Sequence, residues 1–327
     1  MSRQRATAFV PGHVTAFFSA HPAERPAAAG SRGVGVTLTD GVTVRVSAAD
    51  GAGTSAASGE APAPAGSRTA GPRTVNGEPG TIGAAEDALA ALGVSGDGDR
   101  RATEVAVETE LPIGAGFGVS GAAALGAALA ANDAFDCGRS ENDLIRIAHA
   151  ADVGRGTGLG DVVAQARGGV PIRLEPGAPG IGELDGVPGS ARVEYVTFGE
   201  LSTERVLEGD TTALSAAGEA ALDRLCRDPR LSTMMDAARE FAREAELLVP
   251  EVAEAVDAVG AEVAGAETSG TEASGTESAG DAGGHGAAMA MLGRTVFALG
   301  TGLSDAGYDP AVCRIDAAGA RLVDERV

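Results

Sequence analysis

Glycines and a hydroxyl gather in the stretch PIGAGFGVSGAA, which occupies residues 112–123 of the 327-residue chain. An alternating strand pattern precedes this stretch, and an alanine-rich helix pattern follows it. Glycines let backbone N–H groups converge on an anion, and the unpaired N–H groups and dipole of a helix N-terminus add to that attraction. Phosphate is therefore the expected ligand of this loop, and a plain glycine-rich turn is the alternative interpretation.

The same residues allow a dinucleotide interpretation, because Gly116–Gly121 matches the pattern GxGxxG and Asp136 follows Gly116 by 20 residues. In such a site the acid follows a second strand, whereas residues 122–135 are continuous helix material. The motif also places its glycines directly after a strand, whereas residues 110–113 intervene here. An NAD-dependent oxidoreductase is thus one alternative function, and a non-catalytic anion-binding module is another.

Charge and composition exclude several classes of protein. The chain has 46 acidic and 25 basic side chains, a formal net charge of −21, and every basic residue is arginine. Without lysine, mechanisms that need a P-loop lysine, a protein-kinase lysine or a pyridoxal Schiff base are excluded. The acidic balance argues against nucleic-acid and membrane partners and suggests adaptation to high salt, which screens self-repulsion. No signal-peptide pattern or long apolar run is present, so we expect a cytoplasmic protein.

Strand and helix patterns surround the glycine stretch and predict the α+β class. Residues 34–38 and 42–46 flank Thr39-Asp40-Gly41, which predicts a hairpin. Ser140, with Asp143 three residues later, predicts the start of a helix. The other expected elements are strands at 103–109, 170–174, 193–198, 288–291 and 295–299, and helices at 120–132, 161–167, 212–227 and 232–259.

Two segments have compositions typical of surface insertions. Residues 48–72 are rich in Gly, Ala, Ser and Pro, and residues 262–286 carry glutamates at intervals of five with almost nothing apolar. A period of five fits neither a strand nor a helix, so we expect a disordered acidic loop at 262–286. A Gly/Pro-rich break near 175–190 is the best domain boundary, and it predicts domains at 1–180 and 181–327.

The pattern Pro-x-Gly-x-Gly-hydrophobic-Gly-x-Ser-x-Ala, which begins at Pro112, resembles the second motif of the GHMP kinases, a family that includes galactokinase, homoserine kinase and mevalonate kinase. AFVPGHVT at 8–15 is similar to the family's first motif, and GTGLGDVVA at 156–164 is similar to its catalytic-aspartate segment. The third motif is degraded to GAAMAMLG at 286–293. The resemblance implies a two-domain GHMP kinase fold, with a ribosomal-protein-like N-terminal domain and a ferredoxin-like C-terminal domain.

Three stretches narrow this resemblance to the archaeal pantoate kinases: VPGHVTAFF at 10–18, GTGLGD at 156–161 and MLGRTVFA at 291–298. The resemblance implies ATP-dependent phosphorylation of (R)-pantoate to (R)-4-phosphopantoate in archaeal coenzyme A biosynthesis. The acidic, lysine-free composition fits a haloarchaeal source, and a homodimer is a further expectation. Homoserine, shikimate or a mevalonate derivative remain alternative substrates within the superfamily.

The resemblance also implies roles for individual residues. Asp161 is the expected catalytic residue, which accepts or orients the proton of the pantoate hydroxyl. Ser120 and Asp152 are the expected ligands of Mg²⁺, a cation that prefers carboxylate oxygen and water. An arginine is expected to bind the carboxylate of pantoate, because its planar fork accepts a carboxylate bidentately. The expected ATP-binding residues are Pro112, Gly114, Gly116, Gly118, Ser120 and Gly121, and the expected substrate-binding residues are His13, Arg32 and Arg155.

Each acidic or hydroxyl residue of this set also has a purely structural interpretation. Asp161 and Ser120 could only cap their helices, and Asp152 could be a solvated acid near a helix end. Arg32 and Arg155 could both be surface residues. The structure must therefore show whether these side chains come together.

Overall fold

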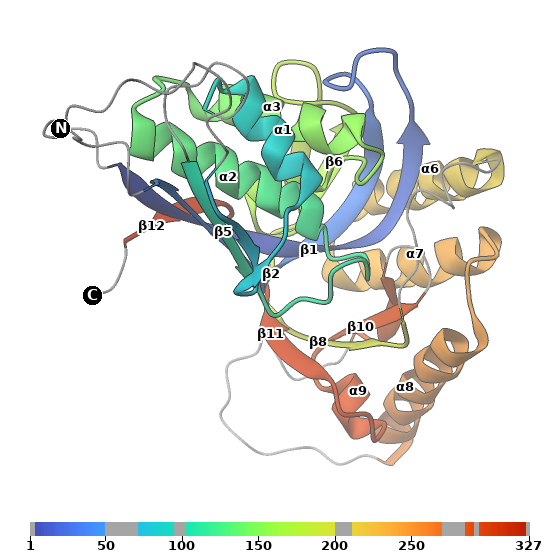
Figure 1. Cartoon of the computed structure of the whole chain (residues 1–327). Coiled ribbons are helices and arrows are strands. Elements are labelled where there is room, and N and C mark those ends of the chain that lie inside the picture. Colours follow the sequence, from blue (N-terminus) through green and yellow to red (C-terminus); the bar gives the residue numbers. More distant parts are fainter. Residues whose placement is uncertain are drawn as a thin grey trace, which may run out of the picture.

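Two β-sheets organise the computed structural model, which describes residues 4–49, 71–94, 103–199, 211–269, 285–290 and 294–324 (Figure 1). Within these residues one sheet has eight strands and the other has four. The larger sheet runs in the order β12-β1-β2-β5-β3-β4, with β6 added to β2 and β7 added to β6. Its strands are β1 Arg5–His21, β2 Gly30–Ala48, β3 Arg73–Val75, β4 Glu78–Pro79, β5 Thr103–Thr109, β6 Pro171–Glu175, β7 Glu183–Gly186 and β12 Arg321–Val323.

One long strand, β2, takes the place of the hairpin expected around residues 39–41. Both halves of β2 pair antiparallel with β1, and the register shifts between Pro11 and Gly12 of β1. A two-residue hairpin turn needs positive φ in its turn residues, and neither Asp40 nor Gly41 has one. The hairpin prediction was wrong because β1 supplies a partner along the whole length of β2, so the turn signal marks an irregularity within one strand.

Helices α1, α2 and α3 cover one face of the larger sheet (Figure 1). The small side chains of α2 let this helix lie close to the strands, since a Cβ on Gly126 would meet Cγ2 of Val44 at 2.6 Å. Ser140 caps α3 by accepting the backbone N–H of Asp143, as predicted. The helices of this half are α1 Gly83–Ala91, α2 Val119–Phe135, α3 Glu141–Gly154 and α4 Asp161–Arg167.

Helices α6 and α7 pack against β1 from the other side of the larger sheet, next to the smaller sheet (Figure 1). The smaller sheet runs in the order β11-β8-β10-β9. Phe241 of α7 packs against Phe17 and Phe18 of β1, with ring centroids 6.4 and 6.0 Å away. The elements of this half are β8 Arg192–Thr197, β9 Ala287–Ala290, β10 Thr295–Leu299, β11 Ala311–Arg314, α6 Thr212–Arg227, α7 Leu231–Glu244, α8 Pro250–Ser269 and α9 Gly302–Asp305.

Two expectations about the second half need correction. The helix expected at 232–259 is two helices, α7 and α8, because Glu246 has a positive φ of 51° and Pro250 begins the next helix. The loop expected at 262–286 is also partly helical, since α8 continues to Ser269. Residues 270–284 of that segment, and residues 50–70 of the other expected insertion, lie outside the described residues.

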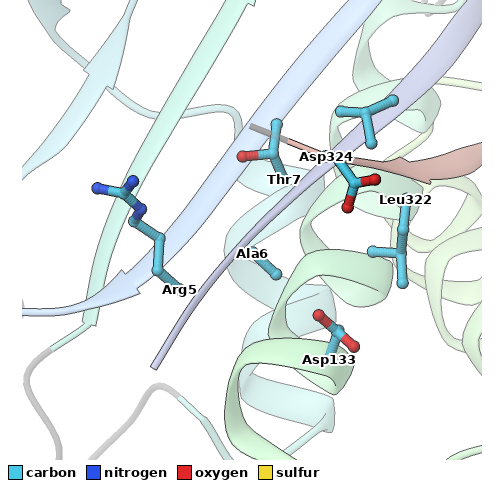
Figure 2. A pocket seen from close by; sticks show the side chains of 7 residues that line it. Arg5, Ala6, Thr7, Asp133, Leu322 and Asp324 are labelled. Carbon is cyan, nitrogen blue, oxygen red and sulfur yellow. The ribbon is translucent and has the colours of Figure 1, made fainter. Parts of the chain in front are cut away.

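The C-terminal strand β12 returns to the larger sheet and pairs antiparallel with β1, Thr7 opposite Val323. Figure 2 shows the cavity of about 260 Å³ beside this pair, into which Asp133 projects from α2. Both β7 and β12 therefore join the sheet of the first half although they follow the boundary expected at 180, and the two-domain division stays a prediction. Within the described ranges, no helix is both long and apolar enough to cross a bilayer.

Candidate active site

The glycine stretch forms an open loop between β5 and α2. Gly114, Gly116 and Gly118 all have positive φ, at 86°, 87° and 65°. L-residues with a side chain rarely adopt this conformation, so the alternation of glycines allows a backbone path that turns its N–H groups toward one side. Gly118 is the N-cap of α2 and no side chain caps this helix, so the first N–H groups of α2 are available to an anion.

The smaller sheet packs against the glycine loop. The Thr295 hydroxyl of β10 donates to the Ala115 carbonyl at 3.3 Å, and the rings of Phe117 and Tyr195 lie 4.8 Å apart. The His13 N–H of β1 donates to the Phe117 carbonyl at 3.0 Å. The loop is therefore held by both sheets, and Thr295 lies two residues after the segment that carries the degraded third motif.

Asp161 is the first residue of α4 and lies in a buried group of charges. Its N-cap is Gly160 and no side chain caps this helix, so Asp161 does not serve as the cap. The His13 Nδ1–H donates to Oδ1 of Asp161 at 2.7 Å, and the His13 side chain is fully buried. Burial raises the pKa of Asp161, but the hydrogen bond from His13 and the nearby Arg173 outweigh it and hold that pKa below its ordinary value. Asp161 is thus an ionised carboxylate at neutral pH.

Arg173, on β6, is the cation of this group. Arg173 is 3% exposed, and neither its Nε nor its Nη1 has a hydrogen-bond partner among the described residues. A Cβ on Gly160 would lie 3.2 Å from Cδ of Arg173 and 3.3 Å from Oγ of Ser31, so these two side chains flank the residue before Asp161. Burial lowers the pKa of Arg173 and the charge of Asp161 raises it. A buried guanidinium with free donors is a site for an anion, because leaving such donors unpaired is costly.

His149, on α3, adds a further unpartnered nitrogen to this neighbourhood. Its Nε2–H donates to the Ala29 carbonyl at 2.9 Å, which leaves Nδ1 buried and without a partner. Burial lowers the pKa of His149, and the charges of Asp161 and Arg173 both act on it. The imidazole is therefore neutral, with one acceptor nitrogen available to a bound hydroxyl.

Asp152 lies near the C-terminal end of α3, beside the glycine loop. Asp152 is 1% exposed, and its Oδ1 accepts a hydrogen bond from the Thr157 hydroxyl at 2.7 Å. That hydroxyl also lies 3.0 Å from Oγ of Ser120. Burial raises the pKa of Asp152 to about 6, and the hydrogen bonds from Thr157 and Ser120 offset only part of this rise. A Cβ on Gly158 would collide with the Asp152 carboxylate, so glycine at 158 leaves room for this acid.

The dinucleotide interpretation fails on the position of Asp136. This residue ends α2 with a φ of 55°, whereas the glycine loop precedes α2. A 17-residue helix is about 25 Å long, so Asp136 is too far from the loop to hold the ribose of a nucleotide bound there. The strand before the loop, β5, is also antiparallel to β2, unlike the parallel strands of a dinucleotide fold.

Comparison with known proteins places the chain in a family. Residues 81–169 match the model of the GHMP kinases N terminal domain. The chain is 36% identical over 255 residues to the pantoate kinase of Thermococcus kodakarensis, an alignment that covers 76% of this chain and 78% of that protein. This chain belongs to the GHMP kinases, in the family of the pantoate kinases. It is therefore a phosphotransferase, and the family resemblance of its motifs is confirmed.

Further relatives extend over nearly the whole chain. The pantoate kinase of Methanospirillum hungatei is 28% identical over 302 residues, covering 92% of this chain and 89% of that protein. A solved phosphotransferase related to the CoA biosynthesis pathway superposes with a TM-score of 0.77 at 28% identity, covering 98% of both chains. A homoserine kinase from Cytophaga hutchinsonii, at 15% identity and a TM-score of 0.61 over 99% of this chain and 98% of its own, shares the fold alone. The GHMP kinase fold and the α+β class are confirmed.

The two arginines expected near the substrate of this GHMP kinase are engaged elsewhere. Arg155 lies at the surface and forms a double hydrogen bond with Asp87 of α1, at 2.5 and 2.8 Å. Arg32 donates to Glu219 of α6 at 2.5 Å and to the Leu174 carbonyl at 2.6 Å. Arg173 was not among the predicted site residues, and its signal in the sequence is an arginine inside an otherwise apolar strand pattern at 170–174.

The residues expected to hold Mg²⁺ fit this role in part. Among the residues that the structure describes, no group of three or more His, Cys, Asp or Glu side chains is placed to hold a metal ion. Asp152 and Ser120 nevertheless bring one carboxylate and one hydroxyl together, directly beside the glycine loop. Mg²⁺ commonly binds through one or two carboxylates and takes its other ligands from phosphates and water. The donor set thus suits a cation that arrives with a nucleotide.

Proposed function

We propose that this GHMP kinase transfers the γ-phosphoryl group of ATP to the hydroxyl of (R)-pantoate and forms (R)-4-phosphopantoate for archaeal coenzyme A biosynthesis. The observation that carries the proposal is the buried, unpaired Arg173 next to the ionised Asp161. A substrate with a carboxylate at one end and a hydroxyl at the other matches this pair. The pantoate kinases among the relatives support the same substrate.

In this proposal Arg173 binds the carboxylate of pantoate. Its free Nε and Nη1 donors can each hydrogen-bond an oxygen of the substrate, and the low exposure of the residue strengthens a charged hydrogen bond. Ser31 and the unpartnered Nδ1 of His149 lie in the same neighbourhood and would meet the hydroxyl groups of the substrate. Arg173 takes over the role that the sequence suggested for Arg32 or Arg155.

Asp161 would orient the attacking hydroxyl and receive its proton. As the new P–O bond forms, the bond to the β-phosphate oxygen breaks, ADP leaves, and the hydroxyl proton passes to a carboxylate oxygen of Asp161. The low pKa of Asp161 makes it a weak base, so we expect the proton to move late, after the nucleophile is aligned. His13, which is fully buried, would act through Asp161 by holding its carboxylate in place.

The glycine loop would hold the ATP phosphates through the N–H groups around Gly114, Gly116 and Gly118 and at the start of α2. Ser120 and Asp152 would hold Mg²⁺ beside the phosphates, with Pro112 and Gly121 at the ends of the loop. The cation would neutralise the charge that develops on the phosphoryl oxygens. A bound cation would favour the ionised form of Asp152, because burial without a cation disfavours that form.

An ADP-release assay over several hydroxy acids tests this proposal directly. Assayed in molar KCl with Mg-ATP, the enzyme should turn over (R)-pantoate and leave homoserine, shikimate and mevalonate unreacted. Turnover of one of those acids without turnover of pantoate would overturn the substrate and keep the reaction class.

The acidic composition supports a cytoplasmic, salt-adapted protein from a halophilic archaeon. We also propose a homodimer and two domains, at 1–180 and 181–327.

With a net charge of −21, self-repulsion between the acidic side chains is strong in dilute buffer and screened in molar salt. The melting temperature should therefore rise between 0.1 and 3 M KCl, a window of roughly 10 to 2 Å in Debye length. A flat or falling melting temperature over that range would contradict the salt adaptation.

A further inference from the structure

Gln165 lies where the catalytic helix meets the phosphate loop. It follows Asp161 by four residues on α4, so the two side chains share one face of that helix. Gln165 is fully buried, and its Nε2 donates to the Gly118 carbonyl at 3.0 Å. A Cβ on Gly118 would lie 2.8 Å from Nε2 of Gln165 and 3.1 Å from Cβ of Asp161, so the loop touches both residues of α4.

The Gly118 carbonyl is the point through which this contact acts. It accepts two hydrogen bonds, one from Gln165 and one from the Ala122 N–H within α2 at 2.9 Å. In a trans peptide the C=O and the following N–H point in opposite directions. The hydrogen bond from Gln165 to the Gly118 carbonyl therefore also fixes the direction of the Val119 N–H, the first N–H group of α2.

The other end of the contact is also held. The Ala320 N–H donates to the Gln165 carbonyl at 2.9 Å and thereby satisfies a carbonyl at the C-terminal end of α4. A Cβ on Gly168 would meet the Gly319 nitrogen at 2.5 Å, so the C-terminal segment lies directly on the turn after α4. This packing gives the Gln165 side chain a fixed base from which to hold the loop.

The chemistry of Gln165 indicates a role beyond packing. Its Oε1 is buried and has no partner among the described residues, which costs free energy that an apolar side chain of the same size would avoid. The hydrogen bond that Nε2 donates to the Gly118 carbonyl is therefore the interaction that favours an amide at this position. A Cβ on Gly121 would lie 3.4 Å from Oε1, so Oε1 lies beside the first turn of α2.

We propose that Gln165 is a positioning residue that sets the phosphate loop relative to Asp161, and so aligns the phosphoryl donor with the attacking hydroxyl. The inference rests on the proposed phosphoryl transfer, with the loop binding nucleotide and Asp161 facing the acceptor. It assigns Gln165 an effect on nucleotide affinity and on turnover, but none on affinity for the acceptor.

Two variants of nearly the same shape test this role. Gln165→Met removes the donor, and Gln165→Glu replaces it with an acceptor that faces the Gly118 carbonyl. The dissociation constant of a non-hydrolysable ATP analogue, measured by calorimetry with Mg²⁺, should rise roughly three- to tenfold in Gln165→Met and further in Gln165→Glu. Turnover should fall in the same order, while KM for pantoate stays within twofold.

Val163→Ala is the matched control, because Val163 is a buried apolar residue of the same helix. It should lower the melting temperature through lost packing and leave the dissociation constant of the analogue unchanged. An analogue affinity within threefold of the parent in both folded Gln165 variants, or an equal loss in Val163→Ala, would overturn the proposal. If either Gln165 variant fails to fold, the other decides. The binding measurement needs no acceptor, so it distinguishes this inference from the choice of pantoate as substrate.

Discussion

Two buried aspartates of the site differ in what surrounds them. Asp161 meets an imidazole N–H and a guanidinium, and its pKa lies below its ordinary value. Asp152 meets two hydroxyl groups, and burial raises its pKa to about 6. Both are almost inaccessible to water, so burial alone does not decide their charge. The difference shows that the partner of a buried acid determines whether it is stable as an anion.

The difference also suggests a division of work. The nearby Arg173 compensates the charge of Asp161, so this carboxylate is ionised before any ligand binds and can accept a neutral hydroxyl group. Among the described residues Asp152 lacks a counter-charge, because its partners Ser120 and Thr157 are neutral, and its anion becomes favourable only when a cation arrives. The Asp161 end is thus preorganised for the acceptor, and the Asp152 end is completed by the nucleotide and its metal.

The largest expected effect comes from Asp161→Asn. Asparagine keeps an oxygen for the His13 N–H but loses the charge and the base. Turnover should fall by roughly 10²–10⁴, measured by ADP release, with little change in affinity for Mg-ATP. Since Gly160 and not Asp161 is the N-cap of α4, a loss of activity cannot be ascribed to a lost cap.

Asp87→Asn is the control for that substitution, because Asp87 is a half-exposed acid that pairs with Arg155 at the surface. It should leave turnover within twofold. Near-parental turnover in Asp161→Asn would instead remove Asp161 as the catalytic residue and make the contrast between the two acids irrelevant to chemistry.

The next effect distinguishes the buried arginine from the exposed one. Arg173→Met should raise KM for pantoate about 10- to 100-fold, as expected for the loss of a hydrogen bond between charged groups. Arg155→Met should change KM less than twofold, because an exposed ion pair contributes little. Initial rates over a range of pantoate concentrations measure both, and equal KM values in the two variants would refute the assignment of Arg173.

The pH dependence should report Asp152 and not Asp161. Because Asp152 must be ionised to hold Mg²⁺ and its pKa is about 6, kcat/KM for Mg-ATP should fall as pH drops through about 6, roughly tenfold per pH unit. Asp161 stays ionised over this range because its pKa lies below the ordinary value. A profile that is flat down to pH 5 would show that Asp152 does not hold the cation.

The smallest expected effect is on stability. The folded-state pKa of Asp152 lies above its unfolded value, so the acid favours folding while protonated and opposes it once ionised, with stability lost as pH rises from about 4 to 6. The change from 3.8 to about 6 corresponds to about 3 kcal/mol at most. At pH 8 without ligands, Asp152→Asn should therefore raise the melting temperature by a few °C in a thermal scan.

Adding Mg-ATP to the thermal scan tests whether Asp152 holds the cation. The parent enzyme should gain stability when the nucleotide and cation bind, whereas Asp152→Asn should gain much less. A variant that melts lower than the parent without ligands would show that the Thr157 and Ser120 hydrogen bonds outweigh the cost of burying the charge.

Much of the site could be predicted from the sequence, because its parts are local. The glycine alternation from Gly114 to Gly118 determines the loop, and Ser140 determines the start of α3. The approach to α4 likewise places Asp161 at the start of a helix, as predicted. These features depend on φ preferences and on hydrogen bonds between near neighbours, which the order of residues specifies directly.

Partners distant in sequence were decided only by the tertiary structure. Among 25 arginines, the sequence offered no reason to prefer Arg173, which becomes special because β6 pairs with β2 and carries it under Gly160. The contact of His13 with Asp161 spans 148 residues, and that of Gln165 with Gly118 spans 47. The hairpin prediction failed for a similar reason, since only the presence of β1 along both halves of β2 removes the turn.

The sequence by itself determined the family, the loop that meets an anion and the acid that begins α4, since short motifs carry all three. The tertiary structure decided which charges are paired. An ion pair at the surface and an unpaired cation in the interior can have the same sequence neighbourhood, and their energies differ because water solvates only the first. Arg155 and Arg173 are the two cases in this chain, one held by Asp87 at the surface and the other left with free donors beside Asp161.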